Sequence, residues 1–163
     1  MTNTTNFKPE LLSPAGSLRN MRYAFAYGAD AVYAGQPRYS LRVRNNEFDL
    51  DSLALGINEA HAQGKKFYVA SNIAPHNKKV HSYIRDIEPV VAMKPDALIM
   101  SDPGLIMMVK GKWPDMPIHL SVQANTVNCA GNEEYIERFK RIAVIEMHRS
   151  GIPASIKLAQ AIL

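Results

Sequence analysis

The start of the chain holds two short apolar segments separated by one helical stretch, and this arrangement constrains the fold most. Residues 10–17 read ELLSPAGS and residues 30–35 read DAVYAG. A helix that begins at Ser17 is expected between the two segments. Parallel strands need such a crossover, whereas a hairpin joins its strands by a tight turn. The sequence therefore predicts a parallel βαβ unit whose first turn lies at the carboxyl end of a strand, where α/β folds bind ligands.

The alternation of strand and helix continues along the chain. Further strands are expected at residues 66–72, 96–102, 118–122 and 142–146, and further helices at 53–63, 81–93, 103–111, 133–141 and 152–163. Asp49 or Asp51 is a suitable N-cap for the helix at 53–63. Pro89 is expected to kink or divide the helix at 81–93. Such regular alternation predicts one parallel sheet with helical crossovers.

Two closures of that sheet compete, a doubly wound open sheet and an eight-fold βα barrel. The turn Pro14-Ala15-Gly16-Ser17 lacks the G-x-G-x-x-G pattern of nucleotide-binding open sheets. Polar residues at every strand end favour the barrel, which collects its active site on one face. A complete barrel takes about 250 residues. We therefore expect an incomplete TIM-type α/β barrel of about five to six βα units: a flexible segment at 1–8, barrel units at 9–128 and a divergent helix-strand-helix tail at 129–163.

Composition narrows the class of protein. The 19 basic and 15 acidic residues give a net charge of +4, which suits an anionic partner such as a carboxylate or an RNA backbone. The single cysteine, Cys129, excludes an internal disulfide, and no metal-ligand motif is present. No apolar run is long enough for a membrane span, and the polar N-terminus does not resemble a secretory signal. A cytoplasmic location without membrane contact is the expectation.

Six sequence blocks identify a family resemblance. They are ELLSPAGS at 10–17, GADAVYAG at 28–35, YSLRVRNNEF at 39–48, YVASNIAPHN at 68–77, DALIMSDPG at 96–104 and HLSVQANTVN at 119–128. In this order they resemble the collagenase-like peptidase family, peptidase family U32, and within it the branch that hydroxylates tRNA. The resemblance covers residues 8 to about 128 and implies a barrel-like fold.

The resemblance also implies a function. Its branch makes 5-hydroxyuridine at the tRNA wobble position with prephenate as co-substrate, and tRNA and a small dianionic carboxylate are then the expected partners. Full-length relatives carry a cysteine cluster associated with an iron–sulfur centre, which the one cysteine of this chain does not reproduce. No cofactor is therefore expected in this chain. Peptidase activity, an older family assignment, and a catalytically silent RNA-binding remnant remain as alternatives, and exposed sheet edges predict self-association.

The arginine-rich loop at residues 38–44 is the leading candidate for substrate binding. Guanidinium groups of Arg38, Arg42 and Arg44 suit the carboxylates of a dianion or RNA phosphates, because they form paired hydrogen bonds with such groups. Tyr39 is a candidate for stacking on an unpaired base. The alternative is a solvated loop in which the arginines pair with Glu47 or neighbouring aspartates.

Polar residues after the later strands complete the candidate site. His76 is a candidate acid–base group because imidazole titrates near neutral pH, although a surface position is the commoner role for a loop histidine. Asp102 is a second catalytic candidate, and it is equally suited to capping the helix that Pro103 begins. The remaining candidates offer hydrogen bonds to a substrate rather than proton transfer, and they are Asn72, Ser101, Gln123 and Asn125.

Overall fold

The computed structural model describes residues 9–41, 46–125 and 142–144. Its described strands form one parallel sheet in the order β1-β2-β3-β4-β5-β6. Their bounds are β1 Leu12–Pro14, β2 Ala31–Gly35, β3 Lys66–Ser71, β4 Ala97–Met100, β5 Ile118–Leu120 and β6 Ile142–Val144. Neighbours in space are therefore also neighbours in sequence, which is the order of a βα barrel and not that of a doubly wound sheet. The α/β, barrel-like fold expected from the sequence is confirmed.

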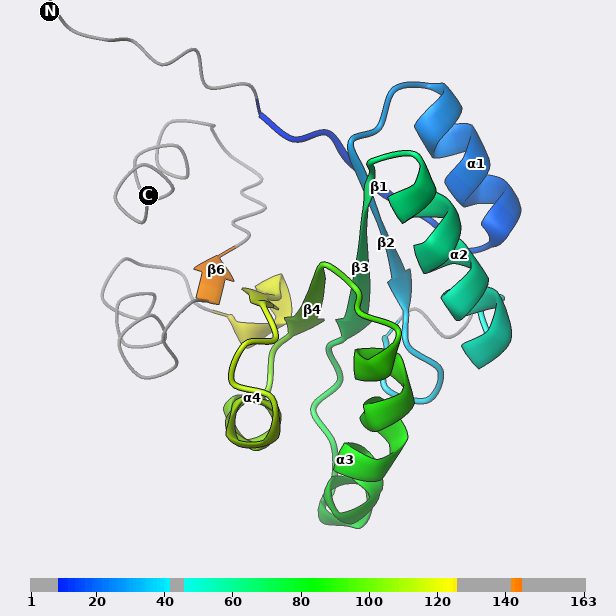
Figure 1. Cartoon of the computed structure of the whole chain (residues 1–163). Coiled ribbons are helices and arrows are strands. Elements are labelled where there is room, and N and C mark those ends of the chain that lie inside the picture. The colour runs from blue at the N-terminus through cyan, green and yellow to red at the C-terminus, as the bar shows by residue number, and fades with distance from the viewer. Residues whose placement is uncertain (1–8, 42–45, 126–141, 145–163) are drawn as a thin grey trace, which may run out of the picture.

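Four α-helices connect the first five strands. They are α1 Leu18–Ala26, α2 Leu50–Ala62, α3 Asn77–Ala92 and α4 Pro103–Lys112, and a short 3₁₀ turn, η2 Val122–Ala124, follows β5. Figure 1 shows α1, α2 and α3 side by side along one side of the strands, with α4 beyond them next to β4. Each helix returns the chain to the start of the next parallel strand, as a βαβ unit requires.

The two faces of the sheet bury different residues. In β3, Phe67 and Val69 pack with the helices in the main core, whereas Tyr68 and Ala70 lie in a second, smaller cluster on the opposite face. This separation follows from the two-residue period of a strand. Both faces are buried, so β3 reads as a continuous apolar run, as central parallel strands do.

Side-chain caps fix where three of the helices begin. Ser17 caps α1 by accepting from the backbone N–H of Asn20, and Asp102 caps α4 by accepting from that of Leu105. Asp49 and Ser52 form a reciprocal capping box at the start of α2. Each cap satisfies a backbone donor that has no partner inside its helix. The sequence expectation of a cap at Asp49 is therefore confirmed, and Asp51 lies in the first turn instead.

Other boundaries differ from those expected. The third helix begins at Asn77 rather than at residue 81, with His76 as its N-cap residue, and it continues through Pro89 without division. The predicted strand at 142–146 is described as β6 Ile142–Val144, which pairs with β5 and so extends the sheet. The helices expected at 133–141 and 152–163 and the segment at 1–8 lie outside the described residues.

No helix among the described residues is both long and apolar enough to cross a membrane.

Gly35, the last residue of β2, is placed where a side chain has no room. A Cβ atom built there would lie 2.6 Å from Ser40 Oγ and 2.8 Å from Ser40 Cβ. The Asn46 amide also binds both the N–H and the C=O of Gly35, so the backbone has little freedom to move away. The loop between β2 and α2 thus folds back directly onto the end of β2.

We expect Gly35→Ala to lower the free energy of unfolding by about 1–3 kcal/mol, the usual cost of overpacking. Gly111→Ala is the matched control, because that glycine lies within α4 with nothing within 4 Å of the added Cβ. This control should stabilise the protein slightly, since alanine is the better helix former. Urea denaturation measures both changes, and equal stability of the two variants would contradict the close packing at Gly35.

Candidate functional site

The carboxyl edge of the sheet is held together by Asn72, which follows β3. Its side-chain oxygen accepts from the backbone N–H of Leu41 at 3.3 Å, and its side-chain nitrogen donates to Ser121 Oγ at 3.3 Å. Its backbone carbonyl accepts from Ser101 Oγ at 3.1 Å. One residue therefore joins the loops that follow β2, β3, β4 and β5, at the edge where parallel sheets bind ligands.

Arg38 lies in the loop after β2 and is directed toward α3. Its guanidinium Nη1 donates to Asp86 Oδ2 at 3.0 Å, while 63% of the side chain stays exposed. The residue has φ 71°, in the left-handed region that a side chain disfavours. The Lys79 ammonium donates to the Arg38 carbonyl, which helps to hold this backbone conformation. Arg38 therefore pairs with a residue of α3, whereas the alternative from the sequence was a pair with Glu47 or a neighbouring aspartate.

Tyr39 is fully buried, which corrects the expectation that its ring stacks on a base. Its hydroxyl donates to Asp86 Oδ2 at 2.7 Å and lies 2.9 Å from Ser82 Oγ. Its ring meets that of Tyr83 edge to face, with 5.0 Å between centroids. Burial raises the pKa of Tyr39, so the phenol stays protonated at neutral pH. The residue anchors the loop to α3 and leaves no ring face for a nucleobase.

Asp86 is the carboxylate with which two arginines pair, and Lys79 lies beside one of these arginines. Arg85 pairs with its Oδ1 at 3.2 Å, Arg38 pairs with Oδ2, and the Lys79 ammonium lies 5.9 Å from the neighbouring Tyr39 ring. The hydrogen bond from Tyr39 and the nearby arginines lower the pKa of Asp86. We call Arg38, Lys79, Arg85 and Asp86 the cationic cluster, because it holds three positive charges and one negative charge.

The two catalytic candidates, His76 and Asp102, both lie at the carboxyl edge of the sheet, and only Asp102 caps a helix with its side chain. His76 is exposed at the start of α3 and makes no side-chain cap with that helix. Asp102 uses Oδ1 to cap α4, with 2.8 Å between that oxygen and the Leu105 nitrogen. The structure thus gives Asp102 the capping role that the sequence allowed, and a catalytic role for either residue stays a prediction.

The remaining candidates follow β4 and β5. Ser101 is buried and bonded to Asn72, so it supports the edge instead of facing a ligand. Gln123 and Asn125 are exposed on and after the 3₁₀ turn, and Asn125 has φ 54°. Their amides are available for hydrogen bonding, and their predicted contact with substrate stays a prediction. Arg42 and Arg44 lie outside the described residues.

Sequence reasoning missed a polar group on the face of the sheet away from the helices. The Tyr68 hydroxyl donates to Glu10 Oε1 at 2.6 Å, and Lys66 pairs with Glu10 Oε2 at 2.6 Å. His119 packs edge-on against Tyr68, with 4.6 Å between ring centroids, and burial lowers the pKa of His119, so its imidazole is neutral at pH 7. The alternation of side chains along β3 and β5 puts Tyr68 and His119 on this face, whereas the contact of Tyr68 with Glu10 required the structure.

The cofactor expectation from the sequence stays a prediction. Iron–sulfur clusters are bound by several cysteine thiolates, and this chain contains one cysteine. Within the described ranges, no group of three or more His, Cys, Asp or Glu side chains could hold a metal ion.

Fold and site together define an α/β protein of the parallel, barrel-like class, with its polar loops at the carboxyl edge of the strands. Residues 16–144 match the model of peptidase family U32. The chain belongs to this family, as the sequence blocks indicated.

Two curated relatives are similar to this chain at high identity. tRNA hydroxylation protein P of Escherichia coli (strain K12) is 78% identical over 124 residues, which cover 76% of this chain and 27% of the relative. The protein of the same name from Haemophilus influenzae is 74% identical over 127 residues, covering 78% of this chain and 28% of the relative. The chain therefore spans little more than a quarter of the relatives that it matches.

Two solved structures share the fold. A U32 peptidase has a TM-score of 0.63 at 11% identity and covers 88% of this chain and 61% of its own. Oxaloacetate acetylhydrolase has a TM-score of 0.60 at 13% identity, covering 98% of this chain and 58% of its own. At these identities the likeness concerns the fold alone.

The lowered pKa of Asp86 predicts that its contribution to stability depends on pH. Because its folded-state pKa lies below the ordinary carboxyl value of 3.8, its stabilising contribution is complete above that pH and is lost as the pH falls. We expect Asp86→Asn to be less stable than wild type by about 1–3 kcal/mol at pH 7. Thermal denaturation between pH 3 and pH 7 should show the difference shrinking at the acid end, and a constant difference would contradict the charged role of Asp86.

Proposed function

We propose that this chain is the N-terminal substrate-binding part of a tRNA-hydroxylating enzyme. It would hold tRNA and a small dianionic carboxylate at the carboxyl edge of the sheet. The observation that carries this proposal is the 78% identity with tRNA hydroxylation protein P of Escherichia coli over 124 residues, which cover 76% of this chain.

The finer chemistry belongs to the same proposal. The reaction would form 5-hydroxyuridine at the wobble position, with prephenate as co-substrate. Prephenate carries two carboxylates, and the exposed guanidinium of Arg38 retains donors that its single contact with Asp86 does not use. His76 would serve as an acid–base group and the amides of Gln123 and Asn125 as hydrogen-bonding groups for the substrate.

The cationic cluster supports RNA binding in particular. Its three cations outnumber its one carboxylate, and both arginines are exposed at the edge to which the other polar loops converge. An RNA backbone is bound mainly through such cations, with release of counterions. Because Asp86 fixes the direction of both guanidinium groups, the cluster is ordered before a phosphate arrives.

Peptidase activity receives less support from the same residues. The serines at the strand ends have partners other than a histidine: Ser71 pairs with Tyr83, Ser101 with the Asn72 carbonyl, and Ser121 with the Asn72 amide. A serine nucleophile needs an adjacent base to activate it. The family name alone favours proteolysis here.

A chimera tests the hydroxylation proposal. In this chimera, the matching 124 residues of the Escherichia coli relative are replaced by those of this chain. The chimera is expressed in cells that lack the relative. We expect 5-hydroxyuridine in tRNA, measured by mass spectrometry, at a level close to that of the intact relative. The fragments of the digested tRNA show whether the modified nucleotide stands at the wobble position. A stable, soluble chimera without hydroxyuridine would contradict the proposal.

Charge reversal tests the cationic cluster. Arg38→Glu with Arg85→Glu should weaken tRNA binding by this chain at least about tenfold at low salt and reduce the salt dependence of binding. Lys112→Glu is the control, because Lys112 ends α4 at the opposite edge of the sheet and pairs with Glu88. Fluorescence anisotropy over a range of salt concentrations measures both effects. Equal weakening of tRNA binding by Lys112→Glu would mean that the cationic cluster acts only through the overall charge of the chain, and it would contradict an RNA site at the cluster.

A further inference from the structure

Helix α1 and its C-cap residue Tyr27 carry an exposed row of one arginine and two tyrosines that the core does not explain. Met21 and Phe25 are buried against the sheet, whereas Tyr23 is 53% and Tyr27 86% exposed. At 100° per residue, Tyr23 and Tyr27 lie on the side of α1 opposite to Met21 and Phe25. Arg19 precedes Tyr23 by one turn, and its guanidinium lies 5.6 Å from the centre of the Tyr23 ring. We call Arg19, Tyr23 and Tyr27 the α1 row.

Packing with a neighbouring helix does not account for the α1 row. The side of α1 that faces α2 is formed by Leu18 and Arg22, which meet Gly56 and Glu59 of that helix. Arg22 makes two hydrogen bonds to the Glu59 carboxylate, at 2.6 and 2.9 Å. The α1 row points outward from both the sheet and this contact, so its tyrosine rings are open to a ligand.

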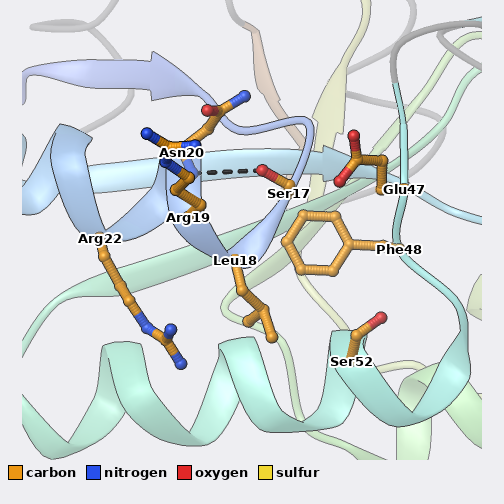
Figure 2. A pocket seen from close by; sticks show the side chains of 8 residues that line it. All are labelled: Ser17, Leu18, Arg19, Asn20, Arg22, Glu47, Phe48 and Ser52. Carbon is orange, nitrogen blue, oxygen red and sulfur yellow. Dashed lines mark hydrogen bonds between the residues drawn. The ribbon is translucent and has the colours of Figure 1, made fainter.

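A groove adjoins the α1 row at the start of the helix. It has a volume of about 520 Å³, within the range of ligand sites. Figure 2 shows its lining from the first turns of α1 and α2 and the segment before α2: Ser17, Leu18, Arg19, Asn20, Arg22, Glu47, Phe48 and Ser52. The backbone N–H of Glu47 donates to the Gly16 carbonyl, so the β1–α1 turn and the β2–α2 loop meet here. The groove therefore opens beside the carboxyl edge that carries the candidate site.

The chemistry of row and groove suits single-stranded RNA. Aromatic rings stack on bases of any sequence, and an arginine nearby binds phosphate. Helix α1 contains Arg19 and Arg22 and no acidic residue. Glu47 is the one carboxylate that lines the groove, and a carboxylate accepts hydrogen bonds from ribose hydroxyl groups, which DNA lacks at the 2′ position.

We propose that the α1 row and the groove form a binding surface for an unpaired RNA segment, separate from the cationic cluster. Arg19 contacts a phosphate, Tyr23 and Tyr27 stack on two bases, and Glu47 accepts from a ribose hydroxyl. The inference rests on the proposed function, because it assigns a second contact to the same tRNA. A strand that crosses this surface continues directly onto the carboxyl edge.

Binding of a short, labelled single-stranded RNA tests the surface by fluorescence anisotropy. Tyr23→Ala with Tyr27→Ala should weaken binding by this chain at least about tenfold, since each stacked base contributes substantially. Tyr23→Phe with Tyr27→Phe keeps the rings and should bind within about twofold of wild type. Arg19→Ala should lower the salt dependence, whereas Lys112→Ala, a loss of the same charge on α4, should leave it unchanged. All three changed α1 residues are exposed, so the variants should keep the wild-type melting temperature.

The outcomes separate this inference from the proposed function. If wild type binds tRNA and the alanine variants bind the short RNA as tightly as wild type does, the inference fails and the proposed function stands. If wild type binds neither RNA, both fail. If the phenylalanine variants lose RNA binding as much as the alanine variants do, stacking is overturned. If wild type self-associates and the alanine variants do not, the surface is a protein contact instead and the inference fails. RNA containing 4-thiouridine should crosslink to Tyr23 or Tyr27, and crosslinks confined to other residues overturn the inference.

Discussion

The hydrogen bonds of Asn72 are the constraint on which the candidate site depends. Parallel pairing aligns the strands but does not fix the loops that follow them. The side chain of Asn72 spans from the β2–α2 loop to the end of β5, and its carbonyl holds Ser101. These hydrogen bonds thereby fix the loops that carry the exposed polar groups at this edge. An active site needs such support, because small displacements of a positioning residue are costly to a reaction.

A second constraint joins the same loop to the helical layer. The buried Tyr39 hydroxyl and the exposed Arg38 guanidinium both reach Asp86, one from inside the protein and one from the surface. A buried hydrogen bond to a charged group stabilises more than a neutral one does. Tyr39, which the sequence suggested for stacking on a base, therefore orders the loop. Arg38 beside it remains available to an anion.

The parts that the sequence predicted are those governed by local patterns. Apolar runs bounded by turns located the strands, and Ser17, Asp49 and Asp102 located helix starts, because capping depends on residues within one turn. The start of α3 was missed since Asn77, Lys78 and Lys79 carry no apolar periodicity. The partners of Tyr39 and Tyr68 were also missed, because Asp86 and Glu10 lie 47 and 58 residues away along the chain. The α1 row required knowledge of which side of the helix stays uncovered.

The contact between Glu10 and β3 has a consequence for the edge of the sheet. Strand β1 is short and borders the sheet, a position from which strands fray or recruit other chains. Glu10 precedes β1 and reaches past β2 to Tyr68 and Lys66 on β3. Detachment of β1 therefore has to break a hydrogen bond to a buried phenol two strands away. Within the described sheet, the first strand is therefore held by contacts with β3 as well as by its pairing with β2.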